Sequence, residues 1–187
     1  MDRHVYWQPW DEPGLEHLHL KQEAGAIVAN GMILRVQESR PFRVHYQVRC
    51  DRQWRVREAL ITRLDDRRVI SLRSNGEGVW TDGNGAALLH LDGCVDIDIS
   101  ASPFTNTLPI RRLNLTSGAA EVIAVAFISV PDMQVTLEQQ QYTCLEGAAY
   151  QFLSLDGGFT ARLPVDADGL VIDYPGLFKR VWSGSQT

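Results

Sequence analysis

The sequence lacks the cysteine spacing that marks a metal or disulfide scaffold. Its three cysteines, Cys50, Cys94 and Cys144, lie far apart and form no CxxC pair. The spacing therefore predicts neither a structural zinc site nor a disulfide framework. We expect buried free thiols, because free cysteine is among the most buried residue types.

Long apolar runs are also missing. The N-terminal stretch MDRHVYWQPWDEPG has no apolar segment of the kind found in a signal peptide. No part of the chain approaches the roughly 20 apolar residues of a membrane span. We therefore expect a cytoplasmic protein without a transmembrane segment.

Positive charge is scarce. The chain has 18 Lys and Arg against 23 Asp and Glu, a formal net charge of −5. Binding to a phosphate backbone depends on many Lys and Arg residues, so we expect no nucleic acid partner. All the basic residues except Lys21 and Lys179 are Arg. Genome composition is the simpler explanation of this bias, and bidentate recognition of carboxylate or phosphate is the alternative.

Recognisable catalytic motifs are absent as well. The sequence contains no GxSxG elbow, P-loop, GxGxxG turn or HExxH helix. It offers no strong signal of catalysis, although an enzyme is not excluded. We expect no cofactor and no bound metal.

Alternation with a period of two is the clearest pattern that is present. In residues 42–50 every even-numbered position is apolar or a thiol and every odd-numbered one is polar, as a half-buried strand requires. Further short segments of this kind occupy residues 15–20, 26–36, 54–64, 69–73, 79–91, 94–100, 122–130, 135–144, 150–155, 159–165 and 170–174.

Turn residues separate or interrupt these segments. Asn30-Gly31, Asp82-Gly83 and Asp168-Gly169 are pairs that accept the positive φ of tight hairpins. The pattern predicts one mostly β domain over residues 1–187, built on a long antiparallel sheet. Because an open sheet exposes its edges, we expect this one to curve into a closed or partly open barrel. We expect one short helix or helical loop at residues 102–113, where Ser102 precedes Pro103 as an N-cap.

Asp96, Asp98 and Ser100 alternate along one predicted strand, so their side chains share a face. A solvated face is the interpretation that this pattern favours. A polar lining of a binding cavity and an acid/base pair of carboxylates are the alternatives.

His17 and His19 also share a strand face. Such a pair can ligate zinc if a third ligand comes from elsewhere in the chain. A hydrogen-bonded or exposed pair is the simpler interpretation. Trp54 and Arg57 lie in a charged and aromatic cluster, which is either a solvated ladder of ion pairs or the mouth of a sugar-binding cavity.

Seven strings of the sequence carry a family resemblance: GLEHL (14–18), ANG (29–31), CDRQWRVRE (50–58), SNGEGVWTDGNG (74–85), LDGCVDIDISASPFTNTLPIRRL (91–113), VPDM (130–133) and DGLVIDYPGLFKR (168–180). Together they span nearly the whole chain and resemble the bacterial family of putative glycolipid-binding proteins. The string SPFTNTLPIRRL is highly specific.

The resemblance implies a curved antiparallel sheet similar to that of the periplasmic lipoprotein carriers, with an apolar interior suited to a lipid tail. It supplies no catalytic residues. The positions that it implies for ligand binding are Trp54, Arg57, Trp80, Asp82, Asp96, Asp98, Thr105, Asn106, Arg111, Asp173 and Tyr174.

We therefore expect a binding protein for a small amphiphile that is glycolipid-like or fatty-acid-like. Its apolar chain would lie inside the curved sheet, where each buried methylene contributes about 0.8 kcal/mol, and its polar headgroup would lie at the mouth. The alternatives are a hydrolase that uses Asp96 or Asp98 on a carbohydrate or lipid ester, and a scaffold protein without a ligand.

Overall fold

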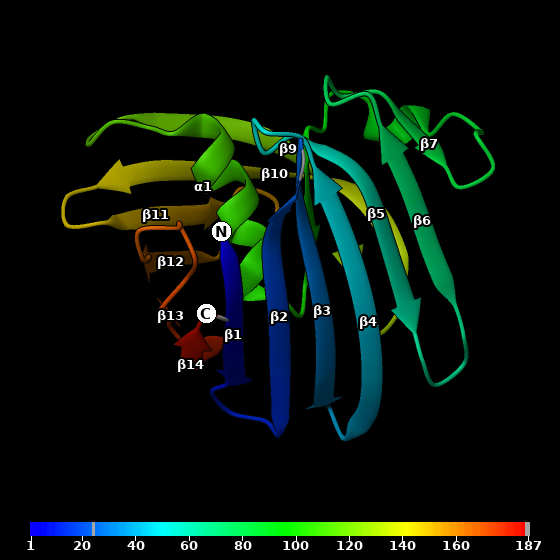
Figure 1. Cartoon of the computed structure of the whole chain (residues 1–187), viewed down its shortest axis with the longest axis horizontal. Coiled ribbons are helices and arrows are strands. Elements are labelled where there is room, and N and C mark those ends of the chain that lie inside the picture. Colours follow the sequence, from blue (N-terminus) through cyan, green and yellow to red (C-terminus); the bar gives the residue numbers. More distant parts are fainter. Residues whose placement is uncertain (24, 186–187) are drawn as a thin grey trace.

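Two β-sheets make up most of the molecule. The computed structural model describes residues 1–23 and 25–185. The larger sheet has nine strands (Figure 1), in the spatial order β13 (Asp173–Tyr174), β14 (Phe178–Gly184), β1 (Asp2–Pro9), β2 (Gly14–Glu23), β3 (Ala26–Gln37), β4 (Arg40–Cys50), β5 (Val56–Arg63), β6 (Val69–Ser74) and β7 (Trp80–Asp82).

The smaller sheet has five strands, which run across those of the larger sheet in Figure 1. Their spatial order is β12 (Thr160–Pro164), β11 (Ala149–Ser154), β10 (Gln134–Leu145), β9 (Ala120–Ser129) and β8 (Asp96–Ile99). The helical segments are η1 (Leu89–Leu91), η2 (Pro103–Asn106) and α1 (Thr107–Leu113). In the described part of the chain, no helix is long and apolar enough to cross a membrane.

The period of two predicts β4 correctly. All five even-numbered residues from Phe42 to Cys50 are buried, whereas the odd-numbered ones between them are exposed or half-buried. Asn30-Gly31 does not break β3, which continues through both residues. Gly31 lies opposite Tyr46, and a Cβ there would come within 2.0 Å of the Tyr46 ring. This glycine makes room for an aromatic side chain and forms no turn.

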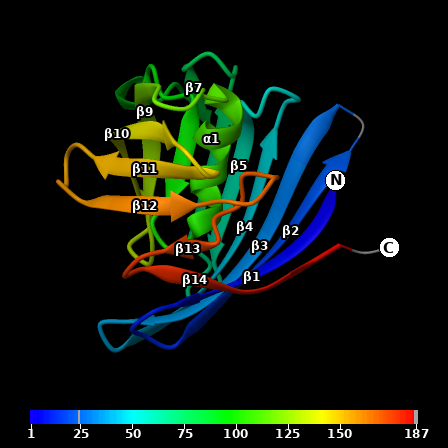
Figure 2. The same ribbon diagram turned by 90° about the vertical axis from the view of Figure 1, so that its left-hand side faces the viewer.

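The barrel prediction is not confirmed. Neither sheet closes on itself: the larger ends at β13 and β7, and the smaller ends at β12 and β8. The larger sheet curves, and the smaller one lies against its concave side (Figure 2). The antiparallel prediction also has one exception, because β8 and β9 are parallel. A parallel pair needs a crossover connection, and η2 and α1 supply it.

Two strands, β1 and β14, lie outside the predicted segments. They pair with each other near one end of the larger sheet, where only β13 lies beyond β14. The predicted helical segment is confirmed: the Ser102 hydroxyl accepts a hydrogen bond from the Phe104 amide, which caps η2, and α1 follows directly.

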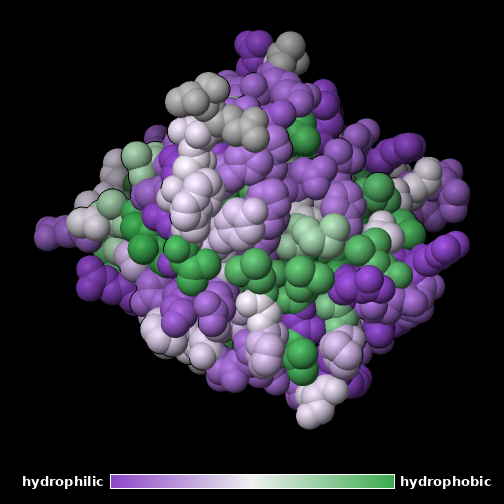
Figure 3. Space-filling view, turned by 60° about the horizontal axis from the view of Figure 1, so that its bottom comes forward, coloured by the Kyte–Doolittle hydropathy of each residue, from purple (hydrophilic) through white to green (hydrophobic). Residues whose placement is uncertain are grey.

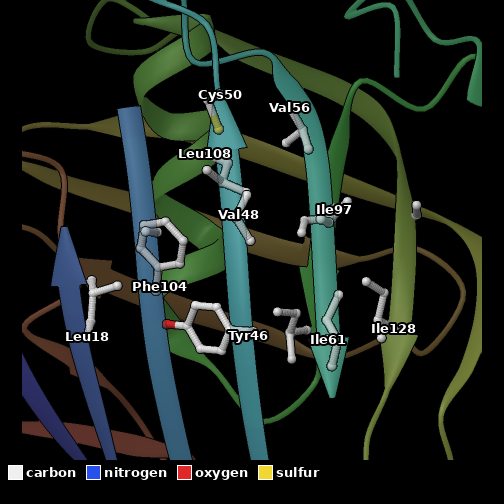
Figure 4. Close-up of a cluster of buried hydrophobic side chains, with 14 of the residues drawn as sticks. Leu18, Tyr46, Val48, Cys50, Val56, Ile61, Ile97, Phe104, Leu108 and Ile128 are labelled. Atoms are coloured by element: carbon white, nitrogen blue, oxygen red, sulfur yellow. The ribbon is translucent and has the colours of Figure 1, made fainter. Parts of the chain in front are cut away.

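Side chains of the protein fill much of the concave face of the larger sheet. Phe104 and Leu108 point from η2 and α1 toward Tyr46 and Val48 of β4 (Figure 4). All four side chains are at most 1% exposed. The space in which we expect an apolar chain is therefore largely occupied by the core. Cys50 and Cys94 are buried and free, as predicted, and Cys144 is half-buried and free.

Candidate functional site

A cleft opens where the smaller sheet faces β13 and β14 at one end of the larger sheet. Its volume is about 220 Å³. Residues from β8, η2, β9, β10, β11, β13 and β14 line it: Asp98, Ile99, Ser100, Ser102, Asn106, Phe127, Glu138, Gln140, Phe152, Ser154, Phe159, Tyr174, Leu177 and Phe178. The cleft is thus built by segments from both sheets and from the crossover between β8 and β9.

Asp98 forms the polar floor of this cleft. Its Oδ1 accepts a 2.8 Å hydrogen bond from the Thr105 hydroxyl, and its Oδ2 accepts a 2.6 Å bond from Nε2 of Gln140. Burial raises the pKa of Asp98, and these two donors lower it in part. The bonds hold the carboxylate in a fixed orientation, as a preorganised ligand site requires.

Asn106 joins the same hydrogen-bond network through Tyr142. The Tyr142 hydroxyl donates a 2.9 Å bond to Oδ1 of Asn106, and it lies 3.3 Å from Oε1 of Gln140. Nδ2 of Asn106 donates to the Pro103 carbonyl at 3.3 Å. These side chains therefore hold one another in place. Because they are already ordered, binding of a ligand costs little side-chain entropy.

One acidic side chain in the cleft is free to take a ligand. Glu138 lies on β10, half-buried, and no hydrogen bond or ion pair engages its carboxylate among residues 1–23 and 25–185. Burial raises its pKa, and the nearby carboxylates of Asp98 and Asp156 add to this shift.

Aromatic rings form one wall of the cleft. Phe152, Phe159 and Tyr174 contact one another with ring centroids 6.0 to 6.3 Å apart. Phe178 extends the group, 6.4 Å from Tyr174. Phe159 is 39% exposed, so part of the wall is open to solvent. Ring faces of this kind pack against the apolar faces of sugars and against hydrocarbon.

A buried carboxyl lies behind the cleft. Oε1 of Glu16 accepts a 2.6 Å hydrogen bond from the Ser102 hydroxyl and a 2.5 Å bond from the Tyr46 hydroxyl. Its Oε2 is buried without a partner in the part of the chain that the structure describes. Burial raises the pKa of Glu16 to about 7, although the two donors act against the shift. Because Ser102 lines the cleft, this carboxyl is one side chain removed from it.

The structure brings four of the residues implied by the resemblance together. Asp98, Asn106 and Tyr174 line the cleft, and Thr105 supports Asp98 from behind. The prediction of a solvated face for Asp96 and Asp98 is wrong, since Asp96 is fully buried and Asp98 is half-buried. Both faces of β8 are covered because η2 and α1 fold back over it.

Asp96 has a different partner and forms a buried ion pair. The Nε–H group of Arg112 is shared between the two carboxylate oxygens, at 3.1 Å from each, and Nη2 donates a 2.6 Å hydrogen bond to Oδ2. The Asp96 side chain is 0% exposed. Asp96 and Asp98 therefore have different partners, and only Asp98 lines the cleft.

Two other residues that the resemblance implies for ligand binding, Trp80 and Asp82, form hydrogen bonds within the protein instead. Trp80 is fully buried, and its indole Nε1 donates a 2.6 Å hydrogen bond to the Cys94 carbonyl. Asp82 accepts 2.9 Å bonds from the amides of Asn84 and Ala86, which closes the turn after β7. Neither side chain lines the cleft.

The remaining implied residues are also outside the cleft lining. The Arg111 guanidinium lies over the Trp54 ring, 5.4 Å from its centroid. Arg57 is exposed and lies 3.8 Å from Asp51. Asp173 accepts a 3.3 Å hydrogen bond from the Trp10 indole.

Sequence reasoning missed Glu138, Gln140, Phe152 and Phe159. The signal was present in β10, where Glu138, Gln140 and Tyr142 alternate and so share a face. The inward face of a strand with two polar residues in succession indicates a polar cavity. Phe159 follows the Asp156-Gly157-Gly158 turn, and no local pattern reveals that it lies beside Tyr174.

A second hollow, of about 300 Å³, lies on the larger sheet and includes Arg49, Glu58, Ser71 and Arg73 in its lining. All its lining residues come from β3 to β6. This hollow is lined by one sheet, whereas both sheets line the cleft, and we therefore regard the cleft as the better candidate.

Comparison with known proteins agrees with the fold. Residues 4–180 match the model of a family described as "Putative glycolipid-binding". The chain is similar to the crystal structure of a DUF1089 family protein from Pseudomonas aeruginosa, with 40% sequence identity and a TM-score of 0.82 over 92% of this chain and 95% of that one. None of the curated proteins matches the sequence. The family match covers almost the whole chain, and the chain therefore belongs to this putative glycolipid-binding family.

Proposed function

We propose that the protein binds a glycolipid-like amphiphile and that the polar headgroup occupies the cleft between the two sheets. One observation carries this proposal: fixed carboxylate and amide groups, Asp98 and Gln140, line the same cleft as an aromatic wall. A sugar ring presents hydroxyl groups at its edge and an apolar face, so it fits both surfaces at once. Glu138 adds a free acceptor for a hydroxyl.

The size of the cleft limits which part of the amphiphile it takes. About 220 Å³ is below the roughly 300–1,000 Å³ of pockets for drug-sized ligands. Together with the filled core, this supports a site for one end of the molecule. The first methylenes of the apolar chain would pack on the exposed edge of Phe159, with about 0.8 kcal/mol for each buried group.

The outer surface supports a path for the rest of the chain. The face at the bottom of Figure 1 carries a band of apolar side chains between more polar regions (Figure 3). This band offers apolar surface to the part of the chain that the cleft cannot hold. This arrangement differs from our expectation of a chain inside the sheet.

The test uses three probes that separate the two ends of the ligand: octyl β-glucoside, methyl β-glucoside and octanoate. Titration calorimetry should show binding of octyl β-glucoside below its micelle concentration and much weaker binding of the other two. Glu138→Gln and Phe159→Ala should each weaken it about tenfold. Leu89→Ala is the matched control, because Leu89 is 74% exposed in η1, outside the cleft.

Equal binding by the wild type and both cleft variants would overturn the proposed site. Tighter binding of octanoate than of octyl β-glucoside would assign the cleft to a fatty acid. Organic extraction of the purified protein followed by mass spectrometry would identify a natural ligand, and its loss in Glu138→Gln would assign it to the cleft.

Hydrolase activity, the alternative function, is measured in the same samples. It would have to pair Asp98 with Glu138, since Asp96 is held by Arg112 outside the cleft. Release of octanol from octyl β-glucoside by the wild type, abolished in Asp98→Asn, would support that alternative. Binding without release supports a carrier or binding protein. Absence of binding to all three probes would favour a scaffold.

A further inference from the structure

Three histidines and an aspartate gather on the outer face of β1 and β2, away from the core. His4 lies opposite His19 in the register of the two strands, and His17 lies opposite Tyr6. Strand alternation places these side chains on one face, while Val5 and Leu18 point into the core. Asp2 extends the row at the start of β1, near the terminus labelled N in Figure 1.

Three of these side chains have the spacing of metal ligands. One ring nitrogen from each of His4 and His19 and one carboxylate oxygen of Asp2 all lie within 4.8 Å of one another. Nε2 of His19 is 2.9 Å from Oδ1 of Asp2. The rings of His4 and His19 stack with centroids 4.0 Å apart.

His17 occupies the position of a supporting residue. Its Nε2 lies 2.9 Å from Nδ1 of His4. When Nδ1 of His4 carries the proton and donates it to His17, Nε2 of His4 is left as a free lone pair. That Nε2 is buried and has no hydrogen-bond partner in the described ranges. Ligating histidines commonly use their second nitrogen for such a hydrogen bond, which fixes the tautomer and the ring orientation.

We propose that Asp2, His4 and His19 bind a divalent transition metal ion of the zinc class, with His17 orienting His4. Two imidazoles and a carboxylate are the ligands of several zinc sites that keep one coordination position open. A neighbouring hollow of about 330 Å³ is lined by His4 and His17 together with Tyr6, Trp182 and Ser185, so the cluster borders open space on the side of His17.

The experiment is a titration of untagged, chelator-treated protein with Zn²⁺ in competition with a chromophoric chelator at pH 7.5. The wild type should bind one equivalent. His4→Ala and His19→Ala should each lower the affinity at least a hundredfold, and His17→Ala should lower it about tenfold, as expected for a supporting residue. Co²⁺ in place of Zn²⁺ should give visible bands in the wild type that are absent in His4→Ala.

His45→Ala is the matched control, because His45 lies on the same sheet and bonds to Asn30, outside the cluster. It should bind Zn²⁺ as the wild type does. Absence of stoichiometric binding by the wild type, or an equal loss in His45→Ala, would overturn the proposal. If either histidine variant fails to fold by circular dichroism, Asp2→Asn replaces it, since that side chain is 40% exposed; unchanged affinity in Asp2→Asn would equally overturn the three-ligand site.

Discussion

The Ser102 hydroxyl donates a 2.6 Å hydrogen bond to Oε1 of Glu16, a residue 86 positions earlier in the chain. The same Ser102 oxygen caps η2 by accepting from the Phe104 amide. One hydroxyl thus joins β2 of the larger sheet to the helical crossover of the smaller one. Because Ser102 also lines the cleft, the ionisation of Glu16 is linked to the geometry of the proposed ligand site.

Glu16→Gln should alter how stability depends on pH. The folded-state pKa of Glu16 is about 7 against 4.5 for the free side chain. The folded state therefore holds this proton more tightly, and the resulting stability is complete below pH 4.5 and is lost as the pH rises to about 7. The shift corresponds to about 3 kcal/mol at about 1.4 kcal/mol per unit.

The quantity to measure is the difference in the free energy of unfolding between wild type and Glu16→Gln, from urea titrations at pH 4 to 8. Relative to the variant, the wild type should lose about 3 kcal/mol across this range. Glu58→Gln, at an exposed position of β5, corrects for the general effect of removing one charge. A difference that stays constant with pH would show that Glu16 is not desolvated.

Gly31→Ala should destabilise the protein strongly. The added Cβ would lie 2.0 to 2.4 Å from three atoms of the Tyr46 ring, so this ring must move and its hydrogen bond to Glu16 is lost. Overpacking of a core typically costs about 1–3 kcal/mol, and the lost bond places the effect near the upper end. Gly157→Ala, in an exposed turn where the nearest atom is 3.1 Å away, should change stability little. Thermal unfolding of both variants measures the difference. Equal melting temperatures would show that the Tyr46 ring does not need the space that Gly31 leaves.

The strands of this fold were largely predictable because their pattern is local. In β4 the alternation of apolar and polar residues fixes the buried face without knowledge of any partner. The Ser102-Pro103 pair likewise marks the start of η2 by itself. The pattern does not predict how far the sheet closes, because the curvature of the sheet depends on the packing of side chains that are distant in sequence. Phe104 occupies the concave face that a barrel would have left open.

The site was less predictable because its partners come from separate elements. Alternation shows that Asp96 and Asp98 share a face. It does not show that Asp96 forms an ion pair with Arg112 or that Asp98 accepts a hydrogen bond from Gln140. Both contacts depend on how α1 and β10 pack on β8. The family resemblance supplied Asn106 and Tyr174, whereas Glu138 required the observation that β10 carries polar residues on its inward face.

Arg112→Leu should be strongly destabilising because it leaves the Asp96 carboxylate buried without a partner. Removal of one member of a buried ion pair typically costs about 3–5 kcal/mol. Burial already raises the pKa of Asp96 against the opposing effect of Arg112, so the loss should be smaller at low pH, where Asp96 is protonated. Urea unfolding at pH 4.5 and 7.5 measures this dependence. Arg40→Leu breaks the exposed pair with Glu38 and should have little effect at either pH; a similar loss in both variants would refute the distinction.

Two tyrosines beside the cleft should respond differently to loss of the hydroxyl group. The Tyr142 hydroxyl donates to Asn106 at 2.9 Å, so Tyr142→Phe leaves a buried amide oxygen unsatisfied and should lower the free energy of unfolding by about 1–3 kcal/mol. The Tyr174 hydroxyl has no hydrogen-bond partner within the described residues, so Tyr174→Phe should leave stability within about 0.5 kcal/mol.

The same two variants distinguish a residue that supports the site from a residue that contacts the ligand. Tyr174 lines the cleft, whereas Tyr142 lies behind Asn106 and Gln140. If the Tyr174 hydroxyl binds the headgroup, Tyr174→Phe should weaken octyl β-glucoside binding severalfold without a change in melting temperature, because only the bound state loses a hydrogen bond. Tyr142→Phe should lower both affinity and melting temperature. Wild-type affinity in Tyr174→Phe would show that this wall contributes only apolar contact, since the phenylalanine ring retains the packing surface.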